Sequence, residues 1–203
     1  MKIICIGRNY ALHAGELNNP LPEDPLIFIK PDSAVLRNNQ QFFYPEFSKD
    51  VHYEVELVIK INRIGKNILK KFAHKYYKDI GIGIDFTARD LQQKCKEKGL
   101  PWEKAKGFDG SAPLGKFIDK NTLPDLRNIS FRLDLNQKTV QEGQSKDMLF
   151  SFDSIIAYIS QFFTLKIGDL LFTGTPQGVG PVKPNDHLEA YIENKKLLDF
   201  KVK

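Results

Sequence analysis

The sequence lacks the features of a membrane-spanning, secreted or disulfide-rich protein. Its longest apolar runs are only a few residues, far below the roughly 20 that a membrane helix needs. The two cysteines, Cys5 and Cys95, are too few for a disulfide framework. The run from Met1 to Ile6 is too short, and too soon followed by Gly7-Arg8-Asn9, to be a secretory signal. We therefore expect a cytoplasmic protein without a membrane partner.

The charge pattern also lacks the marks of a nucleic-acid-binding protein. Thirty basic and 25 acidic residues give a net charge of +5, but the basic residues are scattered and no long basic block interleaves with aromatic residues. A mildly basic balance suits an anionic substrate instead. With 41% hydrophobic and 27% charged residues over a length of 203, the composition predicts one globular domain spanning residues 1–203.

Periodicity predicts a mainly β, α+β fold with a few helices. The pattern at 151–163 is typical of a helix capped by Ser151 or Asp153. A second helix is expected at 87–98, capped by Thr87 and ended by Gly99, and a third at 67–77. A hairpin around Asn136-Gln137 would join 130–136 to 138–144. The other expected strands are 2–6, 26–29, 54–61, 80–84, 169–173, 187–192 and 197–202.

Three carboxylates form the first candidate site. On a strand, Glu54 and Glu56 point to the same face and repel each other unless a cation lies between them. Asp85 ends the apolar run 80–84, which would bring a third carboxylate to the edge of the sheet. Oxygen ligands favour Mg²⁺ or Mn²⁺ over zinc. A solvated strand face for the two glutamates, and a helix-capping role for Asp85, are the alternatives.

Other candidate functional residues lie in three separate segments. His13 and Glu16 are three residues apart, so they share one face of a helical turn, where the carboxylate could orient the imidazole as a general base. Lys106 could bind a substrate carboxylate. Thr175 lies in a Gly-rich turn that could offer its hydroxyl and backbone N–H groups to an anion. Taken singly, His13 and Glu16 are better explained as an exposed surface pair and Lys106 as a solvated lysine, and a plain tight turn is the alternative for the segment of Thr175.

Together and in this order, the motifs resemble the fumarylacetoacetate hydrolase family, and most closely its short acylpyruvate hydrolase and oxaloacetate decarboxylase branch. The resemblance covers nearly the whole chain. Its anchors are Gly7-Arg8-Asn9-Tyr10-Ala11, Phe28-Ile29-Lys30-Pro31, His52-Tyr53-Glu54-Val55-Glu56-Leu57, Asp85-Phe86-Thr87-Ala88-Arg89-Asp90, Lys98-Gly99-Leu100-Pro101-Trp102 and Gly174-Thr175-Pro176-Gln177-Gly178-Val179-Gly180.

The resemblance implies a mixed β-roll of the fumarylacetoacetase C-terminal-like type, usually built into a homodimer. It implies that Mg²⁺ or Mn²⁺ binds the three carboxylates. It implies that His13 and Glu16 form a catalytic dyad on a lid, that Lys106 is catalytic and contacts the substrate, and that Arg8 and Thr175 bind the substrate. The chain lacks the extra N-terminal domain of the full-length fumarylacetoacetases, which argues against their substrate.

The expected substrate is a small 2-oxo acid. As a hypothesis, its carboxylate and 2-oxo oxygens chelate the metal, which stabilises the enolate of the pyruvate part. Hydrolysis of the carbon–carbon bond of an acylpyruvate, decarboxylation of oxaloacetate and keto–enol tautomerisation can all pass through that enolate. An isomerase or hydratase of 2-oxo-dienoic acids is the alternative enzyme, and an inactive acid-binding homodimer is the non-enzymatic one.

Overall fold

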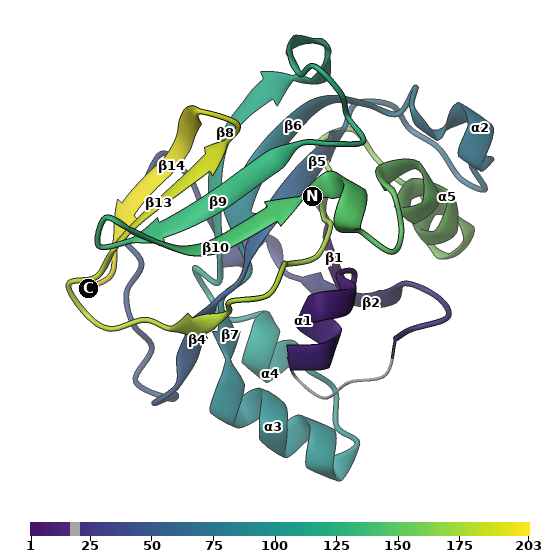
Figure 1. The fold of residues 1–203 in the computed structure, drawn as a ribbon. Helices are drawn as coiled ribbons and strands as arrows, with labels where there is room; N and C mark the ends of the chain where they lie inside the picture. The colour runs from purple at the N-terminus through teal and green to yellow at the C-terminus, as the bar shows by residue number, and fades with distance from the viewer. Residues whose placement is uncertain (17–20) are drawn as a thin grey trace.

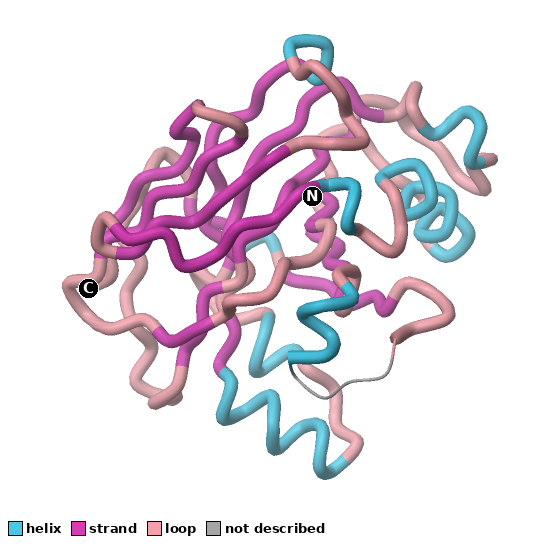
Figure 2. Tube along the Cα trace, viewed as in Figure 1, coloured by secondary structure: helices cyan, strands magenta, loops and turns pink. Residues whose placement is uncertain are grey.

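A computed structural model describes residues 1–16 and 21–203, with the backbone alone for residues 13, 14 and 16. The described strands form three sheets (Figures 1 and 2). The largest has the order β2 (Leu26–Lys30), β1 (Ile3–Gly7), β11 (Leu170–Phe172), β5 (Val55–Ile61), β6 (Tyr77–Ile84), β8 (Ala112–Asp119) and β3 (Val35–Leu36). The second has the order β10 (Lys138–Gln144), β9 (Ser130–Leu135), β13 (His187–Ile192) and β14 (Lys195–Lys201). The third has the order β12 (Gly180–Pro181), β4 (Val51–Tyr53) and β7 (Thr87–Ala88).

The sheets are mixed, because β1 pairs with β11, and β3 with β8, in parallel, while the other named pairs are antiparallel. The described helices are α1 (Ala11–Glu16), α2 (Lys70–Ala73), α3 (Arg89–Lys98), α4 (Glu103–Lys106) and α5 (Phe152–Phe162), with 3-10 turns at Asp32–Ala34, Lys120–Thr122 and Ser145–Asp147. None of these helices is both long and apolar enough to cross a membrane. The prediction of a mainly β fold with a mixed, curled sheet is confirmed.

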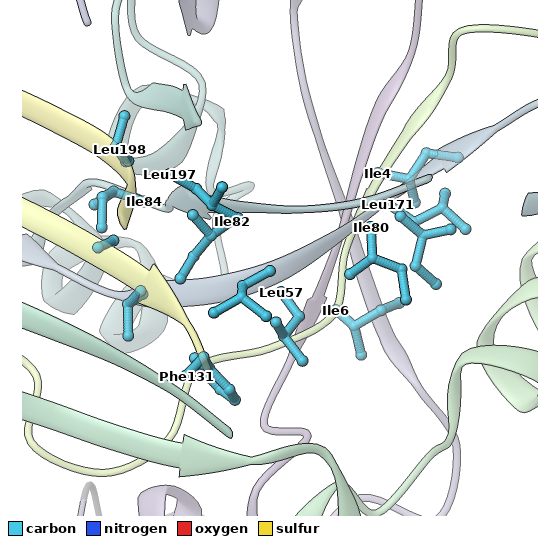
Figure 3. Packing of buried hydrophobic residues seen from close by; sticks show 14 of the residues in the cluster. Ile4, Ile6, Leu57, Ile80, Ile82, Ile84, Phe131, Leu171, Leu197 and Leu198 are labelled. Carbon is cyan, nitrogen blue, oxygen red and sulfur yellow. The ribbon is translucent and has the colours of Figure 1, made fainter. Parts of the chain in front are cut away.

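The main core lies between the seven-stranded and the four-stranded sheets (Figure 3). Leu57 of β5 and Ile82 of β6 meet Phe131 of β9 and Leu198 of β14 there, and all four are buried. Since side chains alternate along a strand, Glu56 points away from this core, on the opposite face of β5. That face is also covered, so the alternative of a solvated strand face for the glutamates is wrong.

The ends of several elements depend on tertiary contacts. The helix expected at 67–77 is wrong, since only Lys70–Ala73 is helical. Asn67 has a φ of 50°, and its N–H donates to the carbonyl of Ser160, which keeps the approach to α2 non-helical, while Tyr77 is already in β6. Ser151 caps α5 as expected, by accepting a hydrogen bond from the N–H of Ser154.

Two further sequence expectations are confirmed and one is corrected. Asn136 and Gln137 both have positive φ, as a two-residue hairpin turn requires, and Gly99 ends α3 in the left-handed conformation. Thr87, however, does not cap α3, which begins at Arg89. Thr87 belongs to β7, where it pairs with β4, and its side chain is thereby directed to the candidate site.

The N-terminal strand is fixed by a buried carboxylate. Asp169, just before β11, accepts hydrogen bonds from the backbone N–H groups of Lys2 and Lys166 and forms an ion pair with the Lys2 ammonium at 2.5 Å. Burial raises the pKa of Asp169, but the Lys2 ammonium and the N–H donors lower it by more, so it lies below its usual value. The ionised form of Asp169 therefore stabilises the fold.

Candidate active site

A cleft opens where the seven-stranded and the three-stranded sheets meet, beside α3 and α4. Its space, including the open mouth, is about 410 Å³. Glu56 projects into it from β5, Asp85 from the residue after β6, and Glu54 from the junction between β4 and β5. Glu54 was expected to begin the strand 54–61, but it lies between β4 and β5, two strands of different sheets.

The three carboxylates lie together at the inner end of the cleft. Glu54, Glu56 and Asp85 are buried, and one ligand oxygen from each lies within 4.8 Å of the other two. Burial raises the pKa of Glu56 well above its usual value, and the charge of Asp85 raises it further. The fold therefore holds acidic groups where their negative charges repel, which a bound cation would relieve.

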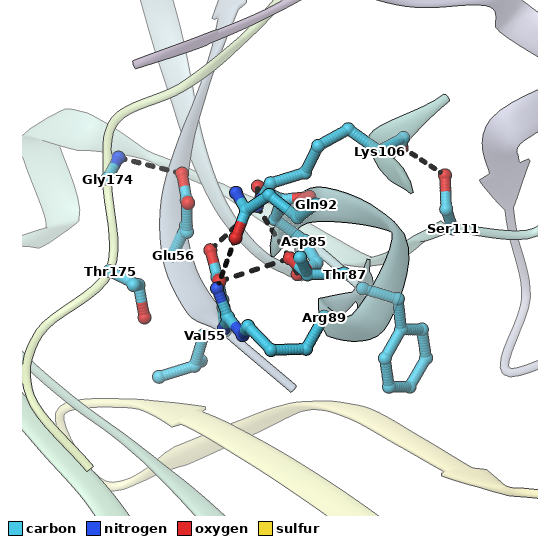
Figure 4. Close-up of polar contacts among 12 residues, drawn as sticks. Val55, Glu56, Asp85, Thr87, Arg89, Gln92, Lys106, Ser111, Gly174 and Thr175 are labelled. Carbon is cyan, nitrogen blue, oxygen red and sulfur yellow. Dashed lines mark hydrogen bonds and ion pairs between the residues drawn. The ribbon is translucent and has the colours of Figure 1, made fainter. Parts of the chain in front are cut away.

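Two cations and a hydroxyl hold these carboxylates in place (Figure 4). The Lys106 ammonium donates to Glu54 Oε2 at 2.9 Å, to Asp85 Oδ2 at 2.6 Å and to Thr87 Oγ1 at 2.6 Å. The Arg89 guanidinium donates to Glu54 Oε1 at 2.6 Å. Burial lowers the pKa of Lys106, but Asp85 and Glu54 raise it by more, so this lysine is an ammonium and not a base.

A third cation, Lys30, contacts the Asp85 oxygen that Lys106 does not contact. Lys30 is wholly buried at the end of β2, and its ammonium lies 2.7 Å from Asp85 Oδ1. That ammonium also contacts the carbonyls of Phe86, Lys106 and Ser111 and the Ser111 hydroxyl. Three N–H bonds cannot serve five oxygens, so Asp85 Oδ1 is buried without a well-directed hydrogen bond from the described residues.

These observations fit a divalent metal. The donors are all carboxylate oxygens, which Mg²⁺ and Mn²⁺ prefer, and one buried oxygen of Asp85 lacks a directed partner in the part of the chain that the structure describes. Glu54, Glu56 and Asp85 would hold the ion, and Lys30 and Arg89 would fix the orientation of the ligands from outside.

The Gly-rich turn after β11 forms one wall of the cleft. The Gly174 N–H donates to Glu56 Oε2 at 2.7 Å, and Gly174 has a φ of 99° that favours glycine. Thr175 is buried and lines the cleft. Its hydroxyl oxygen accepts a hydrogen bond from the Gln141 amide at 3.0 Å, and no described residue accepts its O–H, which can therefore donate to a ligand oxygen.

Asn9 joins this turn to the start of α1. Its buried amide donates to the carbonyls of Thr173 at 2.7 Å and Phe150 at 3.0 Å, and its side-chain oxygen accepts from the Phe150 N–H at 2.7 Å. The preceding residue, Arg8, has a φ of 58°, which is uncommon for a residue with a side chain, and it lines the cleft. Asn9 therefore fixes the position of Arg8 and of Gly174 at once.

The structure brings most of the sequence-predicted site residues into one cleft. Arg8, Lys106 and Thr175 line it together with Glu54, Glu56 and Asp85. The backbone of His13 and Glu16 is part of α1, as a shared helical turn requires. Their side chains lie outside the described part of the chain, so the catalytic dyad stays a prediction.

Sequence reasoning assigned no role to Lys30, Arg89 or Gln92. Lys30 and Arg89 are in the motifs quoted above, but nothing in those motifs shows which carboxylate each would contact. A lysine that ends an apolar strand next to a proline is one usable signal. The spacing of Arg89 and Gln92, three residues apart on one helix face, is another, and Arg89 donates to Gln92 at 2.8 Å.

A second group with metal-ligand chemistry lies on β13 and β14. His187, Glu189 and Asp199 come close together, but they are partly exposed. The Lys196 ammonium already bridges Glu189 and Asp199 at 2.7 Å each, and the His187 ring contacts Asp199 at 2.7 Å. We therefore regard this group as a surface ion-pair network.

Comparisons with known proteins agree on one family. Residues 2–203 match the family described as fumarylacetoacetate (FAA) hydrolase C-terminal. The mitochondrial oxaloacetate tautomerase FAHD1 of Mus musculus is 40% identical over 201 residues, which are 99% of this chain and 91% of that protein. Because that relative is mitochondrial by name, the cytoplasmic location stays a prediction.

Two solved structures have the same fold. The fumarylpyruvate hydrolase of Pseudomonas aeruginosa, in complex with Mn²⁺ and pyruvate, superposes with a TM-score of 0.93 at 35% identity, covering 100% of this chain and 89% of that one. The 5-carboxymethyl-2-hydroxymuconate delta-isomerase of Mycobacterium smegmatis superposes with a TM-score of 0.88 at 34% identity, covering 99% of this chain and 78% of that one. Relatives of this sequence thus include a tautomerase, a hydrolase and an isomerase.

Proposed function

Because this chain belongs to the fumarylacetoacetate hydrolase family, we propose that it is a Mg²⁺- or Mn²⁺-dependent enzyme that acts on small 2-oxo acids. The reaction we favour is keto–enol tautomerisation or decarboxylation of oxaloacetate, with hydrolysis of the carbon–carbon bond of acylpyruvates as the second activity. The observation that carries the proposal is the buried group of Glu54, Glu56 and Asp85 at the end of a cleft with cationic walls.

Charge balance supports an anionic substrate. The three carboxylates are matched by three cations, Lys30, Arg89 and Lys106, so the group is close to neutral before any ion binds. A divalent cation would give it a charge near +2, which attracts a dianion such as oxaloacetate. When bound, such an ion supplies the Lewis acidity that favours the enolate of a 2-oxo acid.

The protein's own side chains would bind and orient the substrate. Lys106 donates three hydrogen bonds at the site and can exchange one of them for a hydrogen bond to a substrate oxygen. There its positive charge would stabilise the negative charge that develops on that oxygen. Thr175 keeps an O–H free for a substrate carboxylate. The predicted base, His13 with Glu16 behind it, would move a proton at the carbon next to the 2-oxo group, or activate water for hydrolysis.

The relatives favour this order of activities. A tautomerase of oxaloacetate is 40% identical over nearly the whole chain, and a fumarylpyruvate hydrolase of similar fold binds Mn²⁺ and pyruvate. The isomerase neighbour keeps an isomerase or hydratase of 2-oxo-dienoic acids as the alternative. A homodimer remains an expectation from the family resemblance.

The test is turnover of oxaloacetate and acetylpyruvate, side by side, with Mg²⁺, with Mn²⁺ and with excess chelator. We expect metal-dependent conversion of oxaloacetate between keto and enol forms, or metal-dependent pyruvate from either substrate. Full activity in chelator would contradict the metal role. No turnover of either substrate, with metal bound, would favour the alternative of an isomerase or hydratase of 2-oxo-dienoic acids. Product analysis after incubation with a 2-oxo-dienoate would then test that alternative.

A further inference from the structure

Two cations that line the cleft, Arg8 and Lys96, have no counter-ion among the described residues. Arg8 and Lys96 both line it, and within residues 1–16 and 21–203 neither has a described hydrogen-bond or ion-pair partner. The described acidic side chains that line the same cleft are the three carboxylates at its inner end, and two of them, Glu54 and Asp85, are already paired with Lys30, Arg89 and Lys106. Among the described residues, this part of the cleft therefore carries an excess of positive charge, which the predicted metal would increase.

Helix geometry aims Lys96 into the cleft. Arg89, Gln92 and Lys96 are spaced at i, i+3 and i+7, so they share one face of α3. Side chains on a helix lean toward its N-terminus, which directs the Lys96 ammonium back toward Gln92 and the carboxylates. Four residues of helix rise by about 6 Å, which is comparable with the span of a four-carbon diacid. Trp102 flanks the lysine, with its ring centroid 6.0 Å from the ammonium.

The electrostatic surroundings of Lys96 agree with this placement. Its pKa is lowered, first by burial and then by the nearby charges of Arg89 and Arg8. The charge of Glu54 partly offsets this, but Glu54 is already paired with Arg89, so a further anion beside Lys96 and Arg8 would be favourable. A carboxylate held between Lys96 and Arg8 would form charge-assisted hydrogen bonds that a methyl group cannot replace.

We propose that Lys96, together with Arg8, binds a second carboxylate at the end of the substrate remote from the 2-oxo group, so that the enzyme prefers dicarboxylic 2-oxo acids to those that end in a methyl or ester group. This inference rests on the proposed function, because it concerns the same cleft and the same class of substrate. It makes Lys96 a residue that determines specificity and does not take part in the chemical step.

The experiment follows keto–enol tautomerisation of oxaloacetate and of its 4-methyl ester, which differs by the loss of the distal charge. Tautomerisation is the reaction compared because the ester has no free distal carboxylate to lose as CO₂. With Mg²⁺ present, Lys96→Met should raise KM for oxaloacetate about tenfold, as expected for one charge-assisted hydrogen bond in a partly exposed position, and leave kcat nearly unchanged. KM for the ester should change less than twofold. Lys96→Arg should restore the preference for the diacid, and Lys98→Met, at an exposed position on the same helix, is the matched control.

An equal rise in KM for both probes, or no rise for oxaloacetate, would overturn the proposal. If Lys96→Met does not fold, Lys96→Gln takes its place in the same comparison. If the wild-type protein turns over neither probe, the proposed reaction has failed, and calorimetric titration of the Mg²⁺-loaded protein with the two compounds tests the subsite separately. In that titration, tighter binding of oxaloacetate than of the ester by the wild-type protein, lost in Lys96→Met, supports the inference. Equal binding of both compounds by the wild-type protein refutes it.

Discussion

Replacing Glu56 by glutamine should have opposite effects on two properties: it should preserve or raise the stability of the metal-free protein, and it should weaken the binding of Mg²⁺. Burial and the neighbouring Asp85 raise the pKa of Glu56, so its ionised form destabilises the metal-free protein at neutral pH. Glutamine removes that charge, yet its amide oxygen can still accept the Gly174 N–H. The metal-free variant should therefore be at least as stable as the wild-type protein. The difference should vanish as the pH falls below about 4, where the carboxyl is protonated in both the folded and the unfolded chain.

The addition of Mg²⁺ should reverse the order of stability. At a free concentration 100 times the dissociation constant, a ligand stabilises the folded state by about 2.7 kcal/mol. At roughly 2–4 °C per kcal/mol for a protein of this size, the wild-type Tm should rise by roughly 5–10 °C. The variant, with one of three ligands lost, should rise by much less at the same concentration and should lose activity.

Differential scanning calorimetry with and without Mg²⁺ measures both effects, and Glu46→Gln, an exposed site, is the control. Equal stabilisation of wild-type protein and Glu56→Gln by Mg²⁺ would refute the assignment of Glu56 as a ligand. A metal-free variant much less stable than the wild-type protein would refute the argument from charge repulsion, since it would show that the ionised carboxylate stabilises the fold.

Three further predictions concern the supports of the site and of the sheet. Asn9→Ala should lower the free energy of unfolding by about 3 kcal/mol in urea titrations, because it leaves buried backbone groups unpaired. A loss below 1 kcal/mol would contradict that role. Gly174→Ala should weaken Mg²⁺ binding, measured calorimetrically, because a Cβ there would lie 2.6 Å from the Asn9 Cβ and displace the N–H that holds Glu56. Unchanged affinity for Mg²⁺ would contradict the role of the Gly174 N–H in positioning Glu56. Asp169→Asn should destabilise the protein near neutral pH and lose that effect progressively as the pH falls below about 4. The lowered pKa of Asp169 gives stability that is complete above the unfolded-state pKa and is lost as the pH falls through the folded-state pKa. A pH-independent difference in unfolding free energy would mean that the ion pair with Lys2 contributes little.

The sequence by itself determined the local features and the set of chemical groups. Hairpin residues Asn136 and Gln137 and the cap Ser151 act through neighbours a few positions away, so their effects can be predicted without the fold. The spacing of Glu54 and Glu56 likewise predicts that both carboxylates reach one place. The helix expected at 67–77 failed for the opposite reason, because contacts with Ser160, more than 90 residues away, override its local propensity.

Only the tertiary structure decided how the site is charged. Lys30, Arg89 and Lys106 come from three separate elements, and the sequence does not show that they converge on Glu54 and Asp85. Burial of the carboxylates, and with it the raised pKa of Glu56, likewise depends on two sheets meeting over β5. Electrostatic energies depend on distance and on exclusion of water, and both are fixed only when remote segments pack together.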